Sequence, residues 1–349
     1  MNGLLKVGLS FVVGAMAVFG LAFAAPAKAQ TTELVVASIG GNLDDVMKKA
    51  TAAFEQKHNV KIRWVPSLSA EKLAKIEASK AKPEFDLAML DDPNHVLGSA
   101  RGLWEKIDRS IVTSWDDLYS QAQGRKQDGV GVGFFVAGFF YRTDEFQKRG
   151  WAPPRKWDDL FRPEFCGSIG LMHPNVSYTI HTLLMLSGGD PKKIDVGIER
   201  LGKLKNCIPV LEPSAPKFEE KIQLGEYLVG INGAIRTIPL AQKGVPVKFV
   251  LPEDGTVSGV TMLAPVKNAP NPKLAQELCN WVIAPDVQQI IIENLFYGPV
   301  NKKVVVTKDL KEKGVLDAEA ISKLIVVDEG DDLSHRRNWV RQTERVMAR

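Results

Sequence analysis

The chain has 349 residues, of which 45% are hydrophobic and 25% are charged, and its formal net charge at pH 7 is +4. This composition excludes an intrinsically disordered chain and a collagen-like fibre, and the length is sufficient for two lobes with separate hydrophobic cores. The basic residues are scattered, so the sequence carries no footprint of a nucleic-acid partner. After the first thirty residues no apolar run reaches the roughly 18 residues that a membrane-spanning helix requires, which excludes a membrane bundle.

Residues 1–29 have the features of a secretory signal peptide. A cation at Lys6 precedes the apolar stretch 7–25, and the small-residue triplet 27–29 has the A-x-A pattern of a cleavage site. We therefore expect export to the periplasm and cleavage after Ala29. The alternative is an uncleaved membrane anchor, because the apolar stretch is long for a signal, but the polar residues that follow favour cleavage.

The chain has three cysteines, and an exported chain meets an oxidising compartment in which a pair can close. Cys279 lies on the apolar face of the helical pattern 274–282, which is typical of a core residue. Cys166 and Cys207 each lie just before a short apolar strand candidate, and neighbouring parallel strands would bring them together. We expect these two to form a disulfide. The thiols are far apart in sequence and the chain has five His, so no metal site is expected.

Strand and helix patterns alternate from Glu33 onward, which predicts an α/β fold with mostly parallel sheets. Asn42 is expected to cap the first helix, because Asp44 and Asp45 then lie in its first turn, where the helix dipole favours acids. Ligands of such folds bind at the carboxyl ends of the strands. The elements expected in the first part are a strand at 34–38, the helix after Asn42, a strand at 61–65, a helix at 70–81 and a strand at 85–90.

A second block of elements follows the glycine-punctuated apolar run 129–141. Its expected strands are 167–172, 208–211, 227–231 and 245–250, and its expected helices are 178–186, 191–204 and 218–224. A strand at 258–265, helices from Leu274 and at 286–293, and a charged helical part from Lys308 follow. Glycine-rich segments near Val136 and Gly259 separate the blocks. The expected organisation is a signal at 1–29, a first lobe at 30–137, a second lobe at 138–259, and a return to the first lobe with C-terminal helices at 260–349.

Several short motifs resemble those of periplasmic solute-binding proteins, in the order in which that family carries them. Trp157–Asp158–Asp159–Leu160, followed by Gly167–Ser168–Ile169, is similar to the family's passage with a W-x-D-L motif before a G-x-I strand. Residues 138–144 resemble its G-x-x-Y-N-T-D crossover strand. The remaining matches are at 250–255, 268–272 and 297–301.

The branch that the chain resembles most includes the spermidine/putrescine and ferric-iron binders. The resemblance implies a type 2 periplasmic binding protein fold, in which two α/β lobes are each a mostly parallel sheet flanked by helices, and two crossover strands form the hinge. It also implies that the lobes close on one small solute and deliver it to the inner-membrane permease of an ABC importer. We therefore expect a monomeric binding protein without enzymatic activity, cofactor or nucleic-acid partner.

The same resemblance bears on the kind of solute. Ferric binders carry adjacent tyrosines as metal ligands, and none of the five Tyr of this chain is adjacent to another, which disfavours iron. Polyamine binders place acids at the start of a second-lobe helix and on the return crossover, but 175–179 and 257–261 contain none. The resemblance to polyamine binders also leads us to expect an aromatic residue at the position where this chain has Ile231. A polyamine binder therefore remains the alternative within the family.

The helix start at 175–179 offers hydroxyl, amide and backbone donors at the positive end of a helix dipole, which suits a carboxylate or a phosphate. Ser177 could instead cap its own helix. Arg236, four residues after Asn232, could supply a bidentate fork to an anion, or could pair with a neighbouring acid. The second-lobe candidates are Asn175, Ser177, Tyr178, Thr179, Asn232 and Arg236.

The first lobe offers a backbone approach at paired glycines and acids at the end of its third strand. Asp91 and Asp92 could hold an amine, or could cap a helix that begins near Asn94. Acids on one wall and an anion site on the other suggest a zwitterionic or anionic solute, such as an amino acid-like, aminophosphonate or carboxylate compound. The remaining candidates are Ile39, Gly40, Gly41, Asn42, Asp91, Asp92, Thr261 and Tyr297.

A secreted hydrolase is the alternative from another class. The sequence has no G-x-S-x-G elbow, H-E-x-x-H helix, Walker loop or G-x-G-x-x-G after its first strand. The glycine-rich run 129–133 has the wrong spacing for a cofactor loop. His173 and His181 are eight residues apart without an evident third ligand, so structural or rim positions are favoured over a metal site.

Overall fold

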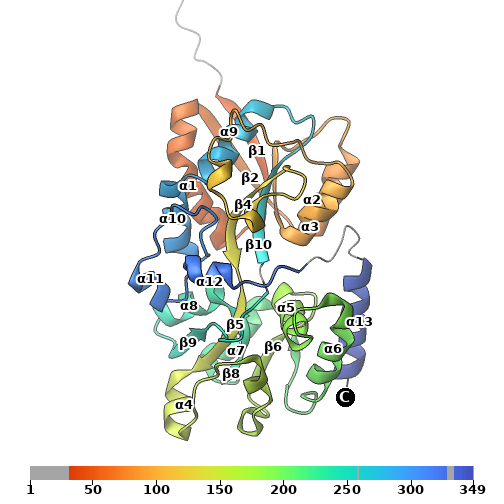
Figure 1. Ribbon diagram of the computed structural model, residues 1–349, viewed down its shortest axis with the longest axis vertical. Coiled ribbons are helices and arrows are strands. Elements are labelled where there is room, and N and C mark those ends of the chain that lie inside the picture. Colours follow the sequence, from red (N-terminus) through yellow and green to blue (C-terminus); the bar gives the residue numbers. More distant parts are fainter. Residues whose placement is uncertain (1–30, 258, 328–333, 349) are drawn as a thin grey trace, which may run out of the picture. The chain divides into compact units, whose positions relative to one another are not determined.

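The computed structural model describes residues 31–257, 259–327 and 334–348, so the expected signal at 1–29 and its cleavage site lie outside the described residues. From Thr32 onward the chain forms one compact unit that contains two five-stranded sheets, each flanked by helices (Figure 1). The predicted two-lobed α/β fold is confirmed, but each sheet is mixed rather than mostly parallel, because the strand that crosses over from the other lobe runs antiparallel to its neighbours. Among the described residues, no helix has both the length and the apolar character needed to cross a membrane.

The first sheet has the strand order β2-β1-β3-β10-β4. β1 is parallel to both β2 and β3, whereas β10 is antiparallel to both β3 and β4. The reversed strand is the one that arrives from the other lobe. The strands are β1 (Thr32–Ser38), β2 (Val60–Pro66), β3 (Leu87–Asp91), β4 (Val130–Phe135) and β10 (Gly259–Pro265).

Helices cover both faces of the first sheet. The buried side of α1, including Met47 and Phe54, joins residues of α9 and α10 in the main core, and α2 contributes Leu73 and Ile76 to a second cluster on the opposite face. Cys279 of α9 is buried and reduced, as the sequence predicted. The helices are α1 (Asn42–His58), α2 (Ser69–Ala78), α3 (Asp92–Ala100), α9 (Pro272–Val282) and α10 (Pro285–Leu295).

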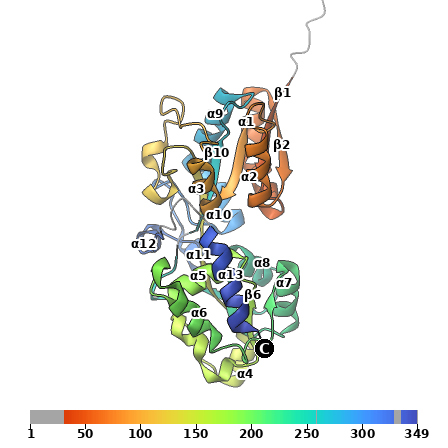
Figure 2. The same ribbon diagram turned by 90° about the vertical axis from the view of Figure 1, so that its right-hand side faces the viewer.

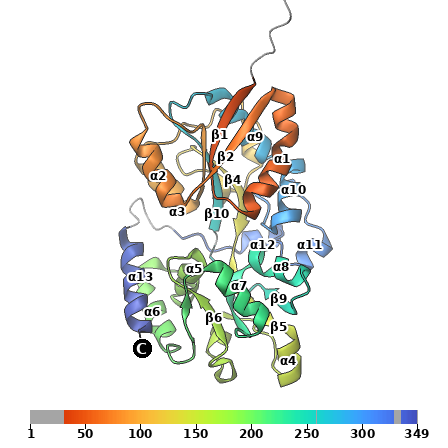
Figure 3. The same ribbon diagram turned by 180° about the vertical axis from the view of Figure 1, so that it is seen from behind.

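The second sheet has the order β7-β6-β8-β5-β9, and β5, which enters from the first lobe, is antiparallel to both β8 and β9. α5 and α6 pack on one face, and α7 and α8 pack on the other (Figure 3). The strands are β5 (Ala137–Arg142), β6 (Ile169–Met172), β7 (Leu211–Glu212), β8 (Val229–Gly233) and β9 (Val247–Val250). The helices are α4 (Thr143–Arg149), α5 (Ser177–Leu186), α6 (Ile194–Gly202), α7 (Ala215–Leu224) and α8 (Ala234–Gln242).

Short 3₁₀ helices and C-terminal helices complete the fold. The 3₁₀ helices are η1 (Trp115–Asp117), η2 (Ser120–Ala122), η3 (Trp157–Phe161), η4 (Pro163–Phe165) and η5 (Pro191–Lys193). The C-terminal helices are α11 (Lys308–Glu312), α12 (Ala318–Ser322) and α13 (Ser334–Met347). The expected strand at 208–211 is reduced to β7, because Ile208 packs into the core in the segment before that strand.

The last helix belongs with the second lobe. α13 lies beside α6, and its Trp339 and Met347 are buried in the core of the second lobe (Figure 2). Glu344 of α13 lies 2.8 Å from a ring nitrogen of His173. Before α13, the backbone N–H of Ile325 donates to the carbonyl of Thr256, so a third chain segment lies beside the second crossover. The sequence predicted two crossovers and did not assign the C-terminal helices to this lobe.

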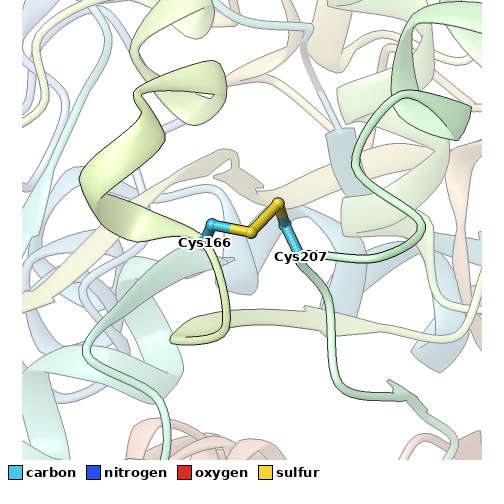
Figure 4. The surroundings of a disulfide bond; sticks show 2 residues. All are labelled: Cys166 and Cys207. Atoms are coloured by element: carbon cyan, nitrogen blue, oxygen red, sulfur yellow. A yellow bond between two sulfur atoms is a disulfide. The ribbon is translucent and has the colours of Figure 1, made fainter.

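The disulfide is the one that the sequence predicted. Cys166, just after η4, is joined to Cys207, which follows α6 (Figure 4). The backbone N–H of Gly167 also donates to the carbonyl of Cys207 at 2.8 Å. The cross-link therefore closes a loop within the second lobe that contains β6, α5 and α6.

Candidate functional site

The topology places the carboxyl edges of the two sheets opposite each other. Val136 alone separates β4 from β5, so the chain leaves the first sheet at its carboxyl edge and enters the second beside the carboxyl end of β8, where Ala137 pairs with Gly233. On the return, β9 ends opposite Phe139, and β10 begins opposite Phe135. Residues at both edges can therefore reach one site, as expected for α/β sheets that bind ligands.

Side chains from both lobes meet at this place. Arg236 of α8 interacts electrostatically with Tyr178 of α5 and with Tyr297 of the first lobe. The hydroxyl of Tyr297 lies 3.2 Å from Oγ1 of Thr261 on β10. Four of the residues predicted from the sequence therefore form one cluster.

An aromatic side chain that the sequence analysis missed lies among them. The ring centroid of Phe135, the last residue of β4, lies 6.3 Å from that of Tyr178, 5.9 Å from that of His181 and 6.4 Å from that of Tyr297. A Cβ added to Gly259 would lie 2.4 Å from the Phe135 ring, so the glycine of the second crossover makes room for it. Phe135 thus joins the aromatic groups of both lobes at the crossover.

The turn from β8 into α8 holds buried polar atoms without a hydrogen-bond partner. Asn232 is fully buried, and neither its Oδ1 nor its Nδ2 has a partner; the same is true of Oγ1 of the fully buried Thr237 and of Nε of Arg236. Unpaired buried groups each cost roughly 1–3 kcal/mol, so they are rare unless a bound molecule satisfies them. Their concentration at one turn marks a candidate anchor for a polar ligand.

Of the two alternatives that its sequence position left open, Arg236 shows the pairing with a neighbouring acid. Its Nη1 donates to Oε1 of Glu219 at 2.9 Å, so it is paired with a neighbouring acid, while its Nε remains available. Burial acts to lower the pKa of Arg236, but Tyr178 and Glu219 outweigh it and the net shift is upward. Burial raises the pKa of both Tyr178 and Tyr297, so both phenols are neutral donors at physiological pH.

The start of α5 differs from the expectation. Val176, not Ser177, occupies the N-cap position and no side chain caps the helix, so the capping alternative for Ser177 is wrong. Ser177 is half-buried and Asn175 is exposed. Thr179 is fully buried and its hydroxyl donates to the carbonyl of Met172 at 2.7 Å. This hydrogen bond connects the start of α5 to the end of β6. The hydroxyl hydrogen of Thr179 is therefore engaged within the lobe and is not a free donor for a ligand.

The first-lobe loop after β1 is held by an acid. Asp44 accepts hydrogen bonds from the backbone N–H of Gly40 at 2.9 Å and from Oγ of Ser38 at 2.6 Å. Gly40 and Gly41 have φ values of 91° and 63°, which glycine adopts without strain. Gly41 is the N-cap of α1, so the prediction that Asn42 caps the helix is wrong: Asp44 and the glycines form the turn instead. Ile39 and Asn42 are exposed at this edge.

The acids after β3 are placed at the same edge. Asp91 pairs with Thr261 across β3 and β10, and its Oδ1 accepts a hydrogen bond from Nδ2 of Asn94 at 2.9 Å. The following helix begins at Asp92 rather than near Asn94, with Asp91 as an N-cap whose side chain makes no capping bond. Both acids are half-buried. Asp91 is therefore adjacent to the Thr261–Tyr297 pair.

Two other kinds of site considered from the sequence are a metal site and a glycine-rich cofactor loop. Among residues 31–257, 259–327 and 334–348, no group of three or more His, Cys, Asp or Glu side chains is arranged to hold a metal ion. Gly133, in the glycine-rich run 129–133, lies in β4, where an added Cβ would lie 2.3 Å from the ring of Tyr297. The glycine run thus serves strand packing, which agrees with its wrong spacing for a cofactor loop.

Comparisons with known proteins bear on these observations. The family described as bacterial extracellular solute-binding proteins matches residues 49–318. A gamma-aminobutyric acid-binding protein of Pseudomonas aeruginosa is 25% identical, over 94% of this chain and 96% of its own. A spermidine/putrescine-binding periplasmic protein of Salmonella typhimurium is 30% identical over 64% of this chain and 66% of its own. A solved ABC transporter protein of Clostridium perfringens has a TM-score of 0.75 at 21% identity, covering 90% of this chain and 99% of its own.

Proposed function

Because the chain belongs to the bacterial extracellular solute-binding proteins, we propose that it binds one small organic solute with an anionic end between its two lobes and delivers it to the permease of an ABC importer. The observation that carries the anionic assignment is the β8–α8 turn, where Asn232, Thr237 and the Nε of Arg236 present buried polar atoms without partners. Amide, hydroxyl and guanidinium groups are all donors that a carboxylate accepts.

The opposite wall supports an amino group at the other end of the solute. Asp91 lies beside Thr261 at the edge of the first sheet, and an ammonium there would gain a charge-assisted hydrogen bond. The gamma-aminobutyric acid-binding relative matches nearly the whole chain, which favours an amino acid-like zwitterion over a polyamine. Asn175, Ser177, Gly40, Gly41 and Asn42 belong to the same proposed site as backbone or polar contacts.

Hinge closure would bring these walls together. We propose that lobes at 30–137 with 260–327, and at 138–259 with α13, rotate about the crossovers, and that contacts made only in the closed form stabilise it. The chain would be exported by cleavage after Ala29 and act as a monomer without enzymatic activity. Release of the bound solute chemically unchanged would distinguish this from a secreted hydrolase.

A thermal-shift screen tests the proposal with amino acids, aminophosphonates, small carboxylates and polyamines. A solute present at 100 times its Kd stabilises the folded state by about 2.7 kcal/mol, which gives a clear upward shift of Tm. We expect shifts with compounds that carry a carboxylate or phosphonate. Shifts with putrescine or spermidine, and with no anion, would show that the chain is a polyamine binder instead.

A further inference from the structure

A buried lysine lies beside β3, the strand that ends at Asp91 in the proposed site. Lys72 of α2 is fully buried, and its Nζ donates to the carbonyl of Met89 at 2.6 Å, two residues before Asp91. A completely buried lysine is rare unless it is paired. The carboxylates that favour its charged form are Asp91 on β3 and Asp44, which holds the Gly40 loop. Lys72 is thus an internal cation at the edge where we place the solute's amine.

We propose that an ammonium group of the solute placed beside Asp91 repels the charge of the buried Lys72, whose Nζ is hydrogen-bonded to Met89 two residues before Asp91, so that binding of an amino-group solute is coupled to loss of a proton from Lys72. This inference rests on the proposed function, because it requires an amine beside Asp91. The electrostatic reason is simple: a second cation next to a buried ammonium raises its energy, and a lysine can relieve that by deprotonating. The proton passes to the solvent, and the lysine remains as a neutral amine hydrogen-bonded to Met89.

The protonation equilibrium of Lys72 already lies close to the pH range in which this exchange can be measured. Burial lowers its pKa to about 8, against the opposing effect of Asp91 and Asp44. The titratable groups around Lys72 are Asp91 on β3, Asp44 on α1, and Asp92 and His95 on α3, which packs against α2. Burial also lowers the pKa of His95, which keeps its ring neutral around pH 8. A charge change near pH 8 is therefore assigned to Lys72 and not to His95.

The measurement is isothermal titration calorimetry of the wild-type protein with γ-aminobutyrate in buffers of different ionisation enthalpy. At pH 8 about half of Lys72 is protonated, so its displacement releases about 0.5 proton per solute bound. The affinity should rise about tenfold between pH 7 and pH 9, while the solute's own amine stays charged. Butyrate, which has the same carboxylate and no amine, should bind without proton release.

Two matched variants test whether the proton released on solute binding comes from Lys72. Lys72→Met removes the cation with little change in shape, and it should abolish both the proton release and the pH dependence of the affinity. Lys75→Met, on the exposed face of the same helix, should behave as the wild type. If γ-aminobutyrate binds to the wild type with no proton release at pH 8, the inference is wrong, whether or not Lys72→Met folds. If no amino carboxylate binds at all, the proposed function fails instead.

Discussion

Replacing Asn232 by leucine tests whether this residue binds the ligand or stabilises the fold. Asn232 is fully buried with both amide atoms unpaired, whereas the equally buried Asn301 donates to the carbonyl of Ile283 at 2.9 Å and accepts from the N–H of Lys303 at 2.9 Å. Removing an unpaired amide recovers roughly 1–3 kcal/mol, against up to about 1.5 kcal/mol of imperfect packing. Asn232→Leu should therefore leave the solute-free protein as stable as the wild type or about 1 kcal/mol more stable.

The control is Asn301→Leu, which leaves the Ile283 carbonyl and the Lys303 N–H without partners and should lose roughly 2–4 kcal/mol. Urea unfolding of the solute-free proteins, followed by tryptophan fluorescence, measures both. In calorimetry, Asn232→Leu should weaken binding of an anionic solute at least tenfold, while Asn301→Leu at a temperature where it is folded should not. An Asn232→Leu variant that is as destabilised as Asn301→Leu would refute this interpretation of the β8–α8 turn.

Other expectations follow from the same geometry. Replacing Cys166 and Cys207 by alanine opens a cross-link of sequence separation 41, which should lower the free energy of unfolding by about 4 kcal/mol; urea unfolding measures this, and an unchanged midpoint would contradict it. A Cβ at residue 233 would lie 2.2 Å from the hydroxyl of Tyr178, so Gly233→Ala should displace that hydroxyl and weaken solute binding at least tenfold in calorimetry; unchanged affinity would contradict it. Because the folded-state pKa of Lys72 lies at about 8, below its ordinary 10.5, its burial penalty is full below pH 8 and disappears as the pH rises to 10.5. The free energy of unfolding of the wild type should therefore rise by roughly 3 kcal/mol relative to that of Lys72→Met over that interval in urea unfolding, and a constant difference would contradict this.

The sequence predicts elements that depend on local pattern. Alternating apolar strands and helices indicated both sheets, and the glycines near Val136 and Gly259 marked the crossovers, because glycine is where backbones approach closely. The disulfide followed from export and from the positions of Cys166 and Cys207 before two strands. These features depend on local sequence pattern or on the oxidising environment of an exported chain, so they can be predicted before the three-dimensional structure is known.

The features that the sequence did not predict depend on tertiary contacts. Phe135 lies inside an apolar run in which every residue looks like core, and its role appears only when both lobes are in place. The sequence suggested that the Thr179 hydroxyl is a free donor, but this hydroxyl donates to the carbonyl of Met172 at the end of β6. Lys72 has the pattern of an ordinary helical lysine, and nothing in its neighbours along the chain marks it as buried.

Calorimetry with the four-carbon pair γ-aminobutyrate and putrescine tests the central claim most directly, because the two differ mainly in whether one end is a carboxylate or an ammonium. A charge-assisted hydrogen bond contributes roughly 1.5–3 kcal/mol, so exchanging the carboxylate for an ammonium beside Arg236 should weaken binding by at least tenfold. We predict measurable binding of γ-aminobutyrate and much weaker binding of putrescine. Submicromolar binding of putrescine without a response to any amino carboxylate would contradict the assignment of an anion anchor at the β8–α8 turn.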